Sequence, residues 1–194
     1  MHPRNLFFIA ALALAGCGDD PAAVIPGPQA LTRDHIGHYC NMIIKDHAGP
    51  KSQIYVAGRK EGYWFSSVRD GIAFTLLPEE PRNIVAVYVH DMAKAKSWAD
   101  PGPDAWINAK DALYVIGSAK RGGMGALESV PFSDRKVAQS FVANHGGEIV
   151  DYGAVPKEYI LAEAVEKPME MPPEKPMTKP MATDHKGMGH GKKN

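Results

Sequence analysis

The chain has 194 residues with 22 basic and 22 acidic side chains, so its formal net charge at pH 7 is zero. This balance lacks the basic excess of nucleic-acid-binding proteins and argues against a nucleic acid as a partner. Once an N-terminal leader and a polar tail are set aside, the remaining length suits one domain or two small modules.

The N-terminus has the pattern of a bacterial lipoprotein leader. A short basic start with Arg4 precedes the apolar residues 6–15, which fall below the roughly 20 residues that span a bilayer. The sequence Leu-Ala-Gly-Cys then ends at Cys17, which predicts cleavage after residue 16 and acylation of that thiol. We therefore expect a signal peptide over 1–16 and a lipid-anchored, flexible tether over 17–30. The anchor would hold the protein at the periplasmic side of a bacterial membrane, with the outer membrane favoured over the inner.

One thiol remains after Cys17 is blocked by lipid, in the segment Cys40-Asn41-Met42. An unpaired thiol in an exported protein calls for an explanation. Thiolate and thioether are soft donors that select Cu(I), and in an extended segment side chains two residues apart project from one face. A small buried apolar cysteine is the ordinary alternative.

Strand and helix patterns then follow twice in the same order. Residues 53–57 and 62–65 are strand candidates, a helix from Val68 is expected to end near Leu77, and residues 83–89 form a β-branched strand. In the second half, residues 105–108 and 112–116 are strand candidates and residues 148–152 form the closing strand. Between them, Ser133 is expected to cap a helix over 133–144. A short helix is also expected over 157–166.

The two halves can be overlaid through their aromatic residues. Phe65-Ser66 aligns with Phe132-Ser133, Arg69 with Lys136, and Phe74 with Phe141. We predict an α+β fold of two similar ββαβ modules packed together, over residues 31–100 and 101–166. A disordered N-terminal tether and C-terminal tail would flank them.

The predicted tail, residues 167–194, has a different composition from the rest of the chain. Such a mixture of Pro, Lys, Glu and Gly cannot bury enough surface to fold, so we expect disorder. Met and His tracts are typical of low-affinity metal capture. The soft or imidazole side chains there are Met169, Met171, Met177, Met181, His185, Met188 and His190.

The central region resembles the NosL family of lipoprotein copper chaperones that serve the maturation of nitrous oxide reductase. The resemblance is carried by Cys40-x-Met42, by His47-Ala-Gly-Pro50 with Gln53-Ile54, and by Gly62-Tyr-Trp-Phe65. It continues through Met124-Gly125, Val130-Pro-Phe132 and residues 141–147. The family pattern usually has Gly between Cys and Met, where this chain has Asn41.

The resemblance implies a Cu(I) carrier that delivers copper to the assembly machinery of the reductase's copper centres. By matching position, Cys40 and Met42 are implied as ligands, and Met124 as the third. His47 is a further candidate as a ligand, an outer donor or a turn residue, and His35 and His38 are less favoured. A sparse soft ligand set leaves one side of the ion open, which suits transfer between proteins.

Other functions remain open on the sequence. The protein could instead buffer copper or confer copper resistance in the periplasm. A thiol-dependent enzyme would use Cys40 as nucleophile and His38 or His47 as base, but no local catalytic signature accompanies these residues. A metal-free lipoprotein scaffold is a third possibility. We therefore expect a non-enzymatic copper carrier.

Overall fold

The computed structural model describes residues 25–162. The predicted signal peptide, Cys17, most of the tether and the Met- and His-containing tail lie outside the described residues. Within that range no helix has the length and apolar character of a membrane span. The strands are β1 (Ser52–Val56), β2 (Tyr63–Phe65), β3 (Ile84–His90), β4 (Trp106–Asn108), β5 (Leu113–Ile116), β6 (Val130–Phe132) and β7 (Glu148–Asp151), and the α-helices are α1 (Val68–Leu76), α2 (Arg135–His145) and α3 (Lys157–Leu161).

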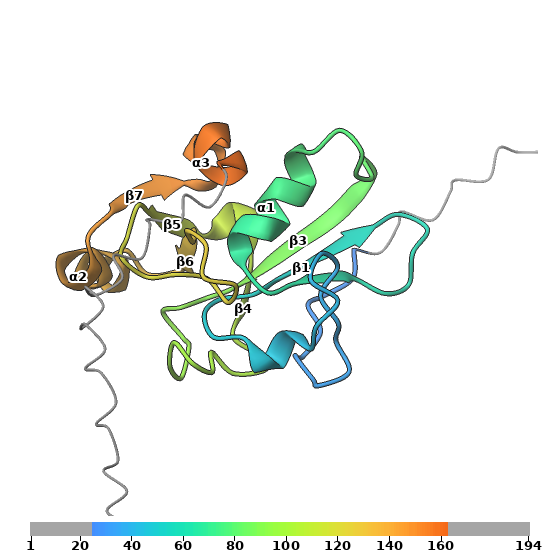
Figure 1. The fold of residues 1–194 in the computed structure, drawn as a ribbon, viewed down its shortest axis with the longest axis horizontal. Coiled ribbons are helices and arrows are strands. Elements are labelled where there is room, and N and C mark those ends of the chain that lie inside the picture. Colours follow the sequence, from blue (N-terminus) through green and yellow to red (C-terminus); the bar gives the residue numbers. More distant parts are fainter. Residues whose placement is uncertain (1–24, 163–194) are drawn as a thin grey trace, which may run out of the picture. The chain divides into compact units, whose positions relative to one another are not determined.

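The first sheet has the strand order β2-β1-β3-β4, and all its neighbours are antiparallel. Helix α1 lies on this sheet (Figure 1). Phe74 of α1 is fully buried against Ile54, Val56 and Phe65. Because the strands alternate and the helix repeats every 3.6 residues, these side chains meet on one face and form a compact apolar core.

The second sheet repeats the pattern with the order β6-β5-β7, again antiparallel. Its helix α2 places Ala138 and Phe141 against Val115, Val130 and Phe132. The rings of Phe132 and Phe141 lie 5.2 Å apart, and the corresponding rings of Phe65 and Phe74 lie 5.4 Å apart. The predicted α+β fold with two ββαβ units is confirmed, and so is the overlay of their aromatic residues.

A shared core joins the two units. Val68 and Ile72 of α1 pack with Tyr114 of β5 and Ile160 of α3 in one buried cluster. Arg69 extends this contact, because its guanidinium donates from Nε to the carbonyl of Ile160 at 2.8 Å and from Nη2 to that of Ala162. Helix α3 therefore holds α1 of the first unit to the second.

Three sequence expectations need correction. Residues 105–108 do form a strand, but β4 pairs with β3 in the first sheet and not with β5. The second strand of the second unit is β6, which was not expected because its central Pro131 opposes strand formation. The cap of α2 is Asp134 and not Ser133, since the Asp134 carboxylate accepts from the amides of Lys136 and Val137.

Candidate metal centre

The segment around Cys40 forms a tight turn. The amide of Asn41 donates to the carbonyl of Gly37 at 2.9 Å, and the amide of Gly37 donates to the carbonyl of Met42 at 2.9 Å. Asn41 takes a left-handed backbone with φ of 54°. Asn tolerates this conformation better than most residues, which explains how it can stand where the family pattern has Gly. The segment is a turn and not a strand, so the rule that side chains two residues apart share one face of an extended segment does not apply to Cys40 and Met42.

Gly37 provides the space for the thiol. A Cβ atom added to Gly37 would lie 2.4 Å from Cys40 Sγ, so no larger residue fits without displacing the sulfur. Cys40 is a free, half-buried cysteine, and Met42 is 40% exposed. A buried apolar role does not describe Met42, because a large apolar side chain gains little from packing when it is this exposed.

The two nearby histidines have structural roles. His35 stacks on Trp64 with ring centroids 3.8 Å apart, and its Nδ1 accepts from the amide of Thr32. Burial lowers the pKa of His35. The ring of His38 packs in T-shaped, edge-to-face contacts with the rings of Tyr63 and Phe74. These contacts give both rings a packing role.

Met124 lies at the tip of a small hairpin in the β5–β6 connection. Arg121 pairs with Leu127 across the hairpin, and the amide of Gly122 donates to the carbonyl of Ala126 at 2.9 Å. Met124 is 50% exposed, so packing does not account for a large apolar residue there. The structure presents this thioether to solvent, as a ligand for an incoming ion requires.

The hairpin and the Cys40 turn both lie beside the stretch where β2 passes into α1. The amide of His38 donates to the carbonyl of Trp64 at 2.8 Å. A Cβ added to Gly123 would lie 2.8 Å from the carbonyl oxygen of Ser66. Residues 64–66 therefore contact both segments, although Cys40 and Met124 are far apart in the sequence.

His47 connects the two units directly. Its Nδ1 lies 3.2 Å from the carbonyl oxygen of Gly123, and because a carbonyl can only accept, this nitrogen carries the hydrogen. The other nitrogen, Nε2, is then left with a lone pair, and it is buried without a hydrogen-bond partner among the described residues. A backbone carbonyl that orients a ring in this way is usual for metal-binding histidines.

Among the described residues, a site with three side-chain ligands has to include thioethers. Within residues 25–162 no three His, Cys, Asp or Glu side chains gather closely enough to hold an ion. Met42 and Met124 are the exposed sulfur donors on the two segments beside residues 64–66.

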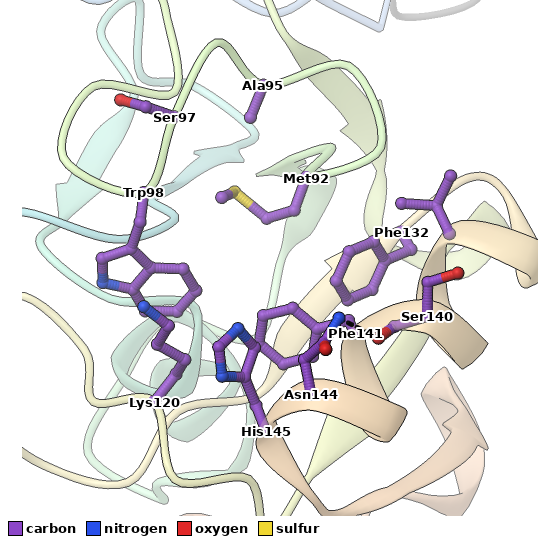
Figure 2. A pocket seen from close by; sticks show the side chains of 11 residues that line it. Met92, Ala95, Ser97, Trp98, Lys120, Phe132, Ser140, Phe141, Asn144 and His145 are labelled. Carbon is purple, nitrogen blue, oxygen red and sulfur yellow. Dashed lines mark hydrogen bonds between the residues drawn. The ribbon is translucent and has the colours of Figure 1, made fainter.

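An apolar pocket of about 310 Å³ lies elsewhere, between α2 and the loop after β3 (Figure 2). Figure 2 shows the Met92 thioether and the His145 ring at its walls, beside Trp98. The ammonium of Lys120 lies 5.2 Å from the Trp98 ring, and its positive charge opposes binding of a cation. The pocket contains none of the predicted ligands.

Sequence reasoning missed three residues that shape this region: Gly37, Gly123 and Glu128. The two glycines leave room for close contacts, and Glu128 is buried at the start of α1, where it accepts from the amides of Val68 and Arg69. Burial raises the pKa of Glu128 to about 8. The Gly122-Gly123 pair before Met124 is a sequence signal of a close backbone contact. It does not indicate which segment makes that contact.

Comparisons with known proteins all lead to one family. The NosL family model matches residues 28–160. The copper-binding lipoprotein NosL of Achromobacter cycloclastes is 43% identical over 165 residues, which cover 83% of this chain and 85% of that protein. The protein of the same description from Stutzerimonas stutzeri is 32% identical over 161 residues, with 82% of each chain covered.

A solved structure is similar as well. The crystal structure of the copper chaperone NosL from Shewanella denitrificans superimposes with a TM-score of 0.63 at 34% identity, covering 68% of this chain and 96% of that one. Family model, curated relatives and solved fold agree, and they confirm the resemblance stated above. This chain therefore belongs to the NosL family.

Proposed function

We propose that this protein is a membrane-anchored Cu(I) chaperone whose ion is held by Cys40, Met42 and Met124, with His47 as a further donor. The observation that carries this proposal is the exposure of both thioethers on the two segments that lie beside residues 64–66. The free nitrogen of His47 supports it from the same junction. Relatives described as copper-binding lipoproteins support the choice of metal.

The donor chemistry selects the oxidation state and the mode of transfer. Thiolate and thioether sulfur favour Cu(I) over divalent ions. Because the thioethers are exposed, a ligand from an acceptor can approach the ion while Cys40 still holds it. Copper then passes by exchange of one ligand at a time, without release of a free ion.

Anaerobic competition against a Cu(I) chelator tests the ligand set. The Cys40→Ala variant removes the anionic sulfur of the proposed site and is expected to weaken binding by more than about 100-fold. This loss exceeds the roughly 10- to 100-fold loss of affinity that follows from removing a residue that only orients a ligand. Met42→Ala and Met124→Ala each remove a neutral donor and are expected to cost less. Tight binding that survives in Cys40→Ala would rule out the site.

From the family resemblance, we propose that the copper is delivered to the copper centres of nitrous oxide reductase. General copper buffering is the alternative. Deletion of the gene should lower the copper content of the reductase under copper limitation if delivery is specific. If the enzyme is fully loaded without the protein and only copper tolerance falls, buffering is the better description. A non-enzymatic role follows from either reading.

The anchor and the tail are separate parts of the proposal. Cys17→Ser is expected to release the protein from the periplasmic side of the membrane, because it removes the thiol that carries the lipid anchor. Cu(I) affinity should be unchanged, because Cys17 is not among the proposed ligands. Deletion of residues 167–194 should leave one tight equivalent and remove weaker ones. Membrane fractionation and copper stoichiometry measure the two effects.

A further inference from the structure

We propose that Glu128 is a positioning residue, which together with Gly123 holds the Met124 hairpin against the first module for copper binding. This inference rests on the proposed function, because it assumes that Met124 is a ligand. Glu128 stands in the second module, four residues beyond Met124 in the chain. Its carboxylate is 1% exposed and reaches across the boundary between the modules.

The carboxylate of Glu128 completes the start of α1. Its Oε1 accepts from the amide of Val68 at 3.2 Å, from that of Arg69 at 3.0 Å and from its own neighbour Ser129 at 2.9 Å. Ser67 caps only the next amide, that of Asp70, at 3.0 Å. The first amides of the helix thus have their partner in the other module, and an unpaired buried donor is costly.

The hairpin is fitted closely onto this cap and onto the first module. A Cβ atom added to Gly122 would lie 2.6 Å from Glu128 Oε2, and one added to Gly123 would lie 2.6 Å from His47 Cβ. The carbonyl of Gly123 also receives the ring hydrogen of His47. The backbone on one side of Met124 is therefore fixed by contacts with the first module.

The two sides of the hairpin are hydrogen-bonded to each other, so we expect a displacement of its base to displace the tip as well. The amide of Gly125 donates to the carbonyl of Gly122 at 2.9 Å, beneath the Arg121–Leu127 pair. A change at its base would therefore move Met124 at the tip. Loss of an outer partner that orients a ligand typically reduces metal affinity by about 10- to 100-fold.

The test compares two helix caps in the full chain by anaerobic Cu(I) competition. Glu128→Ala is expected to weaken Cu(I) binding about as much as Met124→Ala does, and the double variant should bind no more weakly than Met124→Ala alone. Glu128→Gln keeps an acceptor in place and should restore most of the affinity. Asp134→Ala removes the cap of α2 and is the matched control, which should lower thermal stability without changing Cu(I) affinity.

A second variant covers the case in which Glu128→Ala does not fold. Gly123→Ala keeps the cap but forces the hairpin away from His47, so it should also weaken Cu(I) binding about 10-fold or more. Wild-type affinity in folded Glu128→Ala or Gly123→Ala, or additive losses in the double variant, would overturn the inference. If Met124→Ala itself binds as wild type, the proposed ligand set fails, and the inference fails with it.

Discussion

The two modules share an element order but differ in the connection between their first two strands. In the first module, residues 57–62 turn directly from β1 into β2, whereas in the second, residues 117–129 separate β5 from β6. The longer connection carries both the Met124 hairpin and Glu128. The helix starts differ too, since Asp134 caps α2 locally while α1 depends on Glu128. The second module thus supplies both a candidate ligand and a structural support to the first.

Matched phenylalanines test how far the two cores differ. Phe74 is fully buried, whereas Phe141 lines the open pocket of Figure 2. Phe74→Ala should cost about 3–5 kcal/mol of unfolding free energy, and Phe141→Ala clearly less. Urea unfolding of both variants measures the difference. Equal losses would mean that the two cores are packed alike.

The pH dependence of stability tests the contact between Glu128 of the second module and the start of α1 in the first. The pKa of Glu128 is raised from 4.5 to about 8 by burial. Between these pH values, Glu128 therefore keeps its proton in the folded state and loses it in the unfolded state. Its contribution to stability is therefore complete below about pH 4.5 and is lost as the pH rises to about 8. Glu128→Gln should become more stable relative to wild type across this range. Parallel thermal-melting profiles for the two proteins would contradict this.

Substitution of Gly37, which lies beside the Cys40 thiol, tests whether the position of the sulfur matters for Cu(I) binding. Gly37→Ala would place a Cβ 2.4 Å from Cys40 Sγ, so it should move the sulfur and weaken Cu(I) binding roughly 10-fold, or about 1.4 kcal/mol. Gly27→Ala is the control, because nothing lies within 4 Å of an added Cβ there. If a chelator competition finds the same affinity in both variants, the space at Gly37 is not needed for Cu(I) binding.

The smallest expected effect concerns the serine cap of α1. Asp134→Ala should cost about 1 kcal/mol, the usual value for loss of an N-cap side chain. Ser67→Ala should cost less, because Glu128 still pairs with the amides of Val68 and Arg69. Thermal unfolding of the apo proteins provides the comparison. A larger loss in Ser67→Ala would show that Glu128 contributes little to the start of the helix.

Much of the fold could be predicted because its signals are local. The helix from Val68 and the strands around Ile54 and Val87 follow from side-chain periodicity. The pairing of β4 with β3 could not be predicted, because a three-residue strand carries no mark of its partner. Asp134 and Ser133 are both good cap residues, and only the backbone geometry distinguishes them.

The candidate site was predicted through the chemistry of its donors and not through its geometry. Soft side chains such as Cys40 and Met42 can be recognised from their type and spacing. The free nitrogen of His47 depends on a contact with Gly123, 76 positions away in the chain. The role of Glu128 likewise depends on amides of the other module, which no local pattern indicates.

Binding of one Cu(I) ion to both modules at once can be measured by methionine methyl NMR. With the methionine methyl groups labelled with carbon-13, a single equivalent of Cu(I) is added anaerobically to the full chain. If one ion bridges the modules, the signals of Met42 and Met124 shift together and saturate at the same copper ratio, while that of Met92, in the separate pocket, stays unchanged. A shift of Met42 without Met124 would contradict this bridging.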